Sequence, residues 1–198
     1  KKYNIDATYS IIEAEENDLP NIIKQIKDKS LSGVNVTLPY KQKIINNLDK
    51  IINDAEITGS VNTLLQDEDG STVGENTDVF GLQAAYLKEI LNTESKKALV
   101  IGAGGVSPSV IFSLQKSKIY DISIINRTYD KTIFLKKKFP TLKILEWKKL
   151  KEEISNFNII INATSLGLTN GNDFEFDFEN VKQDLVYIDT IYNPLQTK

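Results

Sequence analysis

The chain has 198 residues, 40% of them hydrophobic and 26% charged, and its net charge of −3 implies no basic surface for nucleic acid. It contains no Cys, His or Met, which excludes disulfides, Cys/His metal sites and an imidazole base. We therefore expect no metal, and acid–base chemistry carried by Lys, Asp, Glu or Tyr. The apolar runs are too short to span a membrane and no signal peptide opens the chain, so we expect a cytoplasmic protein; the missing initiator Met indicates a fragment.

Residues 1–76 predict a small α/β unit. Residues 17–30 favour a helix, because Pro20 suits its first turn and isoleucines recur on one of its faces. Asp69 and Gly70 form the dipeptide typical of a hairpin turn. The predicted elements are a strand at 3–12, a helix at 17–30, a strand at 33–38, helical segments from Tyr40 to Ile57 and a hairpin at 60–76.

Residues 77–92 predict a helix that is apolar on more than one side and bridges two units. From there to residue 198, strands alternate with helices, which predicts a doubly wound, Rossmann-like parallel sheet. The predicted elements are a strand from Lys97, a glycine turn at 102–107 and its helix, a strand at 121–128, a helix to Lys138, and strands at 142–147, 157–165 and 185–194.

The strand at 33–38 has two faces. Alternation places Val34 and Val36 on one face, typical of a core, and Asn35 and Thr37 on the other, where they are able to contact a hydroxylated ligand.

Lys41 follows this strand directly. Pro39 suits a first helical position, which predicts Lys41 in the first turn, where the helix dipole favours the neutral amine and lowers its pKa. Such a lysine exchanges protons with an alkoxide; the alternative is one more solvated lysine. Asp78 favours the first turn of the bridging helix, or it pairs with Lys41.

The segment Gly-Ala-Gly-Gly-Val-Ser (102–107) lies between a predicted strand and a predicted helix, as a dinucleotide fingerprint requires. Gly102 allows the tight turn, Gly104 allows the backbone to approach a pyrophosphate, and the amides at the helix start bind it. Ser107 replaces the third glycine. The alternative is a glycine-rich turn that binds no ligand.

Arg127 indicates which dinucleotide binds. An NAD enzyme usually has an acidic residue at the end of the second strand, whereas this strand ends in Asn126, Arg127 and Thr128. Of the 24 basic residues, only Arg127 is an arginine, and its planar fork suits a 2′-phosphate. Lys131 adds a second charge nearby. We therefore predict NADP rather than NAD; the alternative is a surface arginine placed by chance.

A later strand end also carries polar side chains. Asn162, Thr164 and Ser165 end the strand predicted at 157–165, and the carboxyl ends of parallel strands face the ligand crevice. These residues line the cofactor or form a polar turn.

Seven motifs together resemble the shikimate dehydrogenase family, and they occur in the family's order over nearly the whole chain. They are NVTLPYK (35–41), GSVNTL (59–64), GENTDVFG (74–81), GAGGVS (102–107), NRT (126–128), NATSLG (162–167) and DTIYNPLQTK (189–198). The resemblance implies reversible reduction of 3-dehydroshikimate to shikimate by NADPH, in aromatic amino-acid biosynthesis. It implies two α/β domains, at 1–76 for substrate binding and at 93–198 for NADP, joined by a bridging helix at 77–92. We expect a monomer or homodimer.

The resemblance also implies residue roles. Lys41 matches the catalytic acid/base and Asp78 its partner. Positions that hold the substrate match Thr37, Asn62 and Tyr192, with Asn35 supporting the strand. Cofactor positions match Gly102, Ala103, Gly104, Gly105 and Val106 at the pyrophosphate, Asn126, Arg127, Thr128 and Lys131 at the 2′-phosphate end, and Thr190 beside the nicotinamide, where a larger apolar residue is usual.

Two family features fall outside these residues, in line with a fragment: an initial Ser-x-Ser motif and the final helices. Three alternatives stay open. They are a quinate/shikimate dehydrogenase paralogue, a non-catalytic NADP-binding module, and another NADP enzyme with a catalytic lysine, such as the methylenetetrahydrofolate dehydrogenases, which lack the NTD and DTIYNP context.

Overall fold

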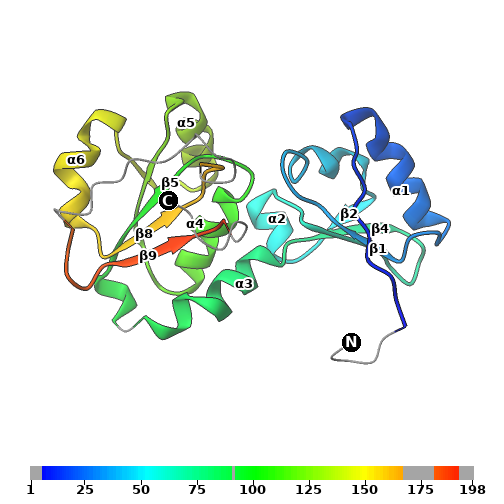
Figure 1. The fold of residues 1–198 in the computed structure, drawn as a ribbon, viewed down its shortest axis with the longest axis horizontal. Helices are drawn as coiled ribbons and strands as arrows, with labels where there is room; N and C mark the ends of the chain where they lie inside the picture. Colours follow the sequence, from blue (N-terminus) through cyan, green and yellow to red (C-terminus); the bar gives the residue numbers. More distant parts are fainter. Residues whose placement is uncertain (1–5, 91, 167–180, 192–198) are drawn as a thin grey trace.

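The computed structural model describes residues 6–90, 92–166 and 181–191, and it contains two lobes joined by helix α3 (Figure 1). The first lobe (6–77) is built on a four-stranded sheet and the second lobe (92–166 and 181–191) on a five-stranded sheet. The predicted class of two α/β domains, the second with a parallel sheet, is confirmed. Within the described ranges, no helix is both long enough and apolar enough to cross a membrane.

The first lobe has the sheet order β1-β3-β4-β2, in which β2 runs parallel to β4 and the other pairs are antiparallel. Leu19, Ile23 and Ile26 of helix α1 pack with Leu64 of β3 in the core. The elements are η1 (Glu16–Asp18), α1 (Leu19–Lys27), β1 (Gly33–Asn35), η2 (Lys43–Asn47), β2 (Lys50–Ile51), α2 (Asp54–Thr58), β3 (Thr63–Gln66) and β4 (Thr72–Glu75).

The helix predicted at 17–30 and the hairpin predicted at 60–76 are confirmed. Pro20 lies in the first turn of α1, as expected, although the N-cap Asp18 makes no capping bond with its side chain. In the hairpin turn, Gly70 has φ +85, a conformation that glycine adopts without steric cost.

In the first lobe one prediction is wrong, and the helical segments predicted from Tyr40 to Ile57 are confirmed only in part. Residues 6–12 of the strand predicted at 3–12 have no regular structure, and residues 3–5 lie outside the described ranges. Their β-branched composition favours a strand, but a strand also needs a partner, and the described neighbour of β1 is β3. Between residues 40 and 57 the chain forms only η2 and α2, with β2 between them, because Lys50 and Ile51 pair with β4.

Helix α3 (Asp78–Ala85) is shorter than the predicted bridging helix, and it continues as the 3₁₀ turn η3 (Leu87–Glu89). Tyr86, with φ −130, separates the two. Helix α3 buries Val79 and Leu82 and packs against α4 of the second lobe, so its first residue lies at the junction of the lobes.

The second lobe has the strand order β7-β6-β5-β8-β9, all parallel. The order reverses at β5, with β6 on one side and β8 on the other, so the crevice at their carboxyl ends is where such sheets bind ligands. The elements are η4 (Thr93–Ser95), β5 (Lys97–Ile101), α4 (Ser107–Lys116), β6 (Asp121–Ile125), α5 (Tyr129–Lys138), β7 (Lys143–Ile144), η5 (Trp147–Lys149), α6 (Leu150–Glu153), η6 (Ile154–Asn156), β8 (Ile159–Asn162) and β9 (Val186–Asp189).

Side chains on both faces of this sheet are buried. Val100 and Ile124 pack on one face with α4 and α5, while Leu99 and Ile160 pack on the other with Ile154 of η6. This explains the near-continuous apolar strands of the sequence, which alternation alone does not predict. The short helix α6 was not predicted.

We expect Ile124→Ala to lower the free energy of unfolding by about 2–5 kcal/mol, because the cavity left in the core cannot fully collapse. Ile11→Ala makes the same chemical change on a side chain that is 89% exposed, and should cost less than about 0.5 kcal/mol. Urea denaturation of both variants measures the difference, and similar losses would contradict the assigned core.

Candidate active site at the junction of the lobes

A cleft of about 810 Å³ lies between the lobes and receives side chains from both. Its lining from the first lobe and α3 is Thr37, Leu38, Lys41, Thr77, Asp78, Gly81, Leu82 and Ala85, with Tyr86 after the helix. Its lining from the second lobe is Gly102–Val106, Asn126–Thr128, Lys131, Ala163–Ser165 and Asp189–Ile191. The carboxyl ends of four strands, β5, β6, β8 and β9, therefore contribute.

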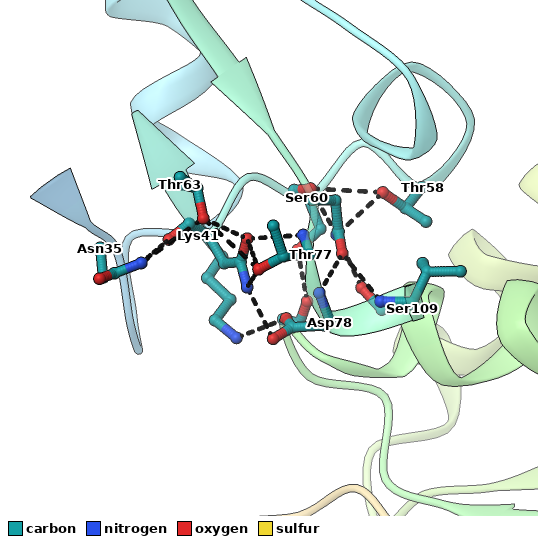
Figure 2. Close-up of polar contacts among 12 residues, drawn as sticks. Asn35, Lys41, Thr58, Ser60, Thr63, Thr77, Asp78 and Ser109 are labelled. Carbon is teal, nitrogen blue, oxygen red and sulfur yellow. Dashed lines mark hydrogen bonds and ion pairs between the residues drawn. The ribbon is translucent and has the colours of Figure 1, made fainter. Parts of the chain in front are cut away.

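Lys41 and Asp78 form an ion pair in this cleft, with Nζ and Oδ2 2.7 Å apart and side chains only 13% and 22% exposed. Figure 2 shows the two side chains pointing toward one another, Lys41 from the first lobe and Asp78 from the start of α3. The Lys41 carbonyl accepts a hydrogen bond from the Val61 amide at 2.8 Å, which holds the backbone below the amine.

The predicted helical position of Lys41 is wrong. Residues 38–42 form turns, and the 3₁₀ helix η2 begins only at Lys43. The segment that carries Lys41 is therefore not the first turn of an α-helix, and the expectation built on the dipole of such a helix has no structural basis. The charged group that contacts Lys41 is instead the Asp78 carboxylate. Pairing with Lys41 was one of the two roles that the residue pattern left open for Asp78.

Asp78 is held from two directions. Asn62 Nδ2 donates to Asp78 Oδ1 at 2.8 Å, and the Asp78 amide donates to Asn76 Oδ1 at 3.0 Å. Asp78 is the first residue of α3, so it occupies the first turn and pairs with Lys41 at once. The two interpretations from the sequence are thus both correct.

The predicted substrate residues divide into three cases. Thr37 lines the cleft. Asn62 contacts Asp78 and Thr77, and Asn35 Nδ2 lies 3.5 Å from the Asn62 carbonyl, but neither asparagine is part of the lining. Tyr192 lies outside the described residues.

The glycine turn has the geometry that the sequence predicts. Gly102 has φ +106, and a Cβ there would lie 2.8 Å from Thr164 Cγ2, so only glycine fits. Ser107, in place of the third glycine, closes the turn: its Oγ accepts from the Gly104 amide and donates to the Gly102 carbonyl, both at 2.9 Å. Helix α4 begins at this serine, so its N-terminus adjoins the cleft.

Arg127 and Lys131 line the cleft beyond the glycine turn and are exposed. Neither forms an ion pair with a carboxylate of the described ranges. Asn126 connects this segment to the turn, because its Oδ1 accepts from the Ala103 amide at 3.2 Å and its Nδ2 donates to the Thr128 carbonyl at 2.8 Å. The two cations are therefore available to an anion beside the turn.

At the ends of β8 and β9, Thr164, Ser165 and Thr190 line the cleft as predicted, whereas Asn162 is buried beneath them. Asn162 Oδ1 accepts from Thr164 Oγ1 at 2.7 Å, and its Nδ2 donates to Asp189 at 3.2 Å. Asn162 thus orders the strand ends.

Several lining residues were not predicted, and two signals in the sequence point to them. Helical spacing from Asp78 indicates that Leu82 and Ala85 share its face. The others adjoin a predicted residue along the chain; examples are Leu38, Thr77, Ala163, Asp189 and Ile191. Tyr187, near the end of β9, does not line the cleft. Burial, and less strongly the Asp189 carboxylate, raise the pKa of its hydroxyl to about 12.

Comparisons with known proteins agree with this geometry. A family model described as the shikimate dehydrogenase substrate binding domain matches residues 1–64, and one described as shikimate / quinate 5-dehydrogenase matches residues 85–190. A shikimate dehydrogenase (NADP(+)) of Pelagibacter ubique is 39% identical over 100% of this chain and 72% of that protein.

Two solved structures are similar in fold. The crystal structure of shikimate dehydrogenase from Aquifex aeolicus has a TM-score of 0.81 and 34% identity, covering 90% of this chain and 65% of that one. The Thermus thermophilus enzyme in complex with NADP(H) and shikimate has a TM-score of 0.77 and 30% identity, covering 91% of this chain and 66% of that one. This chain thus spans about two thirds of the length of these structures.

We expect Gly102→Ala to lower the free energy of unfolding by about 3 kcal/mol or more, because a positive φ is costly for alanine and the new Cβ meets the Ala163 carbonyl at 2.9 Å. Gly70→Ala is the matched control, since Gly70 also has a positive φ but its Cβ would meet no atom within 4 Å. That variant should lose only about 1–2 kcal/mol. Equal losses in urea denaturation would contradict the close packing at Gly102.

Proposed function

The chain belongs to the shikimate dehydrogenase family, and we propose that the protein catalyses the reversible reduction of 3-dehydroshikimate to shikimate with NADPH. The observation that carries the proposal is the Lys41–Asp78 pair, which lines the same cleft as the glycine turn. An acid and a dinucleotide site in one cleft are what reduction of a carbonyl requires.

The residues around the second lobe's strand ends fit NADP. A Cβ at Gly102 would meet the Ala163 backbone, so the tight turn requires glycine there. Gly104 lines the cleft without a side chain, which lets a pyrophosphate approach its backbone, and the start of α4 offers amides. Arg127 and Lys131, without carboxylate partners in the described ranges, have the charge to bind a 2′-phosphate. Thr190 lines the cleft on the side proposed for the nicotinamide.

Lys41 is the proposed acid. When bound, NADPH supplies the hydride. Lys41 Nζ donates a proton to the oxygen that gains negative charge, and accepts one in the reverse direction. Asp78 holds the amine by an ion pair, and Asn62 holds the carboxylate, so the proton donor is oriented before the substrate arrives.

The substrate is proposed to lie beside Lys41, against the first lobe. Thr37 and Thr77 line this part of the cleft and carry hydroxyl groups suited to a polyhydroxylated acid. Asn35 and Asn62 support it through their contacts with one another and with Asp78, and Tyr192 retains its proposed role at the substrate. The domain boundaries at 76/77 and 92/93, the cytoplasmic location and the monomer or homodimer state stay predictions.

Quinate is a second candidate substrate, because the family model that matches residues 85–190 names both acids. The decisive experiment is an absorbance assay at the NADPH band on the protein at its full natural length, with shikimate or quinate and with NADP or NAD. We expect the highest kcat/KM with shikimate and NADP. Higher kcat/KM with quinate would favour the paralogue, and cofactor binding without turnover of either acid would favour a non-catalytic NADP module.

Lys41→Ala should lower kcat by roughly 10²-fold or more while leaving the Kd of NADPH nearly unchanged, because the acid is lost and the cofactor contacts remain. Lys43→Ala is the matched control: Lys43 is two residues away and pairs with Glu16 on the surface. Steady-state kinetics and fluorescence titration measure both. Wild-type kcat in the Lys41 variant would reject the role.

Arg127→Ala should lower kcat/KM for NADPH by about 10- to 100-fold, since a charge-assisted hydrogen bond contributes roughly 1.5–3 kcal/mol. The kcat/KM for NADH should change much less, because NADH lacks the 2′-phosphate. Lys137→Ala, an exposed residue of α5 that does not line the cleft, is the control. Equal losses with the two cofactors would show that Arg127 does not read the phosphate.

A further inference from the structure

Asn76 is a buried side chain, 3% exposed, that stands at the junction of the lobes. Its Oδ1 accepts hydrogen bonds from the amides of Asp78 at 3.0 Å and Val79 at 3.3 Å, and so caps the first turn of α3. Its Nδ2 donates to the Ser60 carbonyl at 2.7 Å and to Ser109 Oγ at 2.8 Å. One amide group therefore contacts the turn that carries Asp78 and a residue of the second lobe.

Ser109 belongs to α4, the helix that begins at the end of the glycine turn, and it is fully buried. Figure 2 shows Ser109 beside the start of α3, where Asp78 lies, with Ser60 and Thr58 close by. A second bond crosses the junction close by, from Ser60 Oγ to the Gly105 carbonyl at 2.7 Å. A buried hydrogen bond from Asn76 to α4 and a part-buried one from Ser60 to the glycine turn thus cross the junction.

We propose that Asn76 and Ser109 are positioning residues that set the distance between the Lys41–Asp78 pair and the cofactor held at the glycine turn. The inference rests on the proposed function, because that distance governs how the proton donor meets the carbonyl receiving the hydride. Alignment of this kind accounts for a large part of enzymatic rate, and errors of about 1 Å cost up to 10²-fold. Neither Asn76 nor Ser109 lines the cleft, so the bond between them acts through Asp78 on one side and α4 on the other.

Because Asn76 has more hydrogen-bond acceptors around it than it has amide hydrogens, the bond to Ser109 can be removed without leaving a buried donor unpaired. Its amide carries two hydrogens and has three acceptors, because Thr58 Oγ1 lies at 3.2 Å in addition to the Ser60 carbonyl and Ser109 Oγ. If the Ser109 hydroxyl is removed, the two acceptors of the first lobe remain for the two hydrogens. The change therefore removes the Asn76–Ser109 bond between the lobes, keeps the Ser60–Gly105 bond, and leaves no buried donor unpaired.

Ser109→Ala should lower kcat about 10-fold, leave the Kd of NADPH within about 2-fold, and raise the kinetic isotope effect with 4-deuterated NADPH, because misaligned hydride transfer becomes rate-limiting. Ser113→Ala is the matched control. Ser113 is also fully buried in α4, but its Oγ donates to the Val110 carbonyl of its own helix at 2.8 Å. Thermal unfolding of both variants checks that they lose similar stability.

A second measurement does not depend on activity. The chain has no cysteine, so Lys24→Cys on α1 and Lys137→Cys on α5, both exposed, place one spin label on each lobe without competing thiols. Double electron–electron resonance spectroscopy measures the distance between the two labels. We expect its distribution to be at least twice as wide in Ser109→Ala as in Ser113→Ala or in the protein with both serines unchanged. Equal widths and equal kcat in the two serine variants would overturn the inference. If the protein with Ser109 unchanged reduces no substrate, the proposed function is refuted and the inference about the lobes is not. The widths of the distance distributions then still decide whether the Asn76–Ser109 bond holds the two lobes.

Discussion

The candidate active site is organised around one ion pair that is largely removed from water. Lys41 lies in a turn after β1 and Asp78 opens α3, 37 residues later, yet their charged atoms are 2.7 Å apart. Burying two charges carries a desolvation cost, which is offset only when the geometry is good and further hydrogen bonds are made. Asn62 supplies such a bond to the carboxylate, and Val61 holds the lysine backbone. The consecutive residues Val61 and Asn62 therefore keep both members of the pair in place.

The second lobe supplies the other half of the cleft through its parallel sheet. All its strands point the same way, so Gly102 after β5, Arg127 after β6 and Thr164 after β8 reach the same edge. The apolar strands bury both faces of the sheet, which makes that edge a rigid support. The tie between Asn76 and Ser109 joins this support to the start of α3, so the cleft has fixed walls on both sides.

Local patterns were sufficient where a single segment determines its own structure. The isoleucine stripe of α1, the Asp69-Gly70 turn and the strand–glycine–helix order at 97–116 were all predicted correctly. Local patterns were insufficient where a segment becomes a strand only by pairing with another strand. Residues 6–12 have strand composition but no regular structure, and residues 50–51 form a strand because β4 lies beside them. Composition describes what a segment favours, whereas a ladder needs a neighbour.

The sequence by itself determined the family, the parallel sheet and most of the residues that line the cleft, because its motifs combine residue type with position at strand ends. Only the tertiary structure decided that Lys41 lies in a turn and that Asn62 and Asn162 support the cleft from behind. It also places Asp78, the partner that the family resemblance implied, 2.7 Å from Lys41. The physical reason is that the partners of a buried amide or a charged group come from segments far apart in the sequence. Tertiary packing decides which of these segments lie together, and the spacing of residues along the chain does not show it.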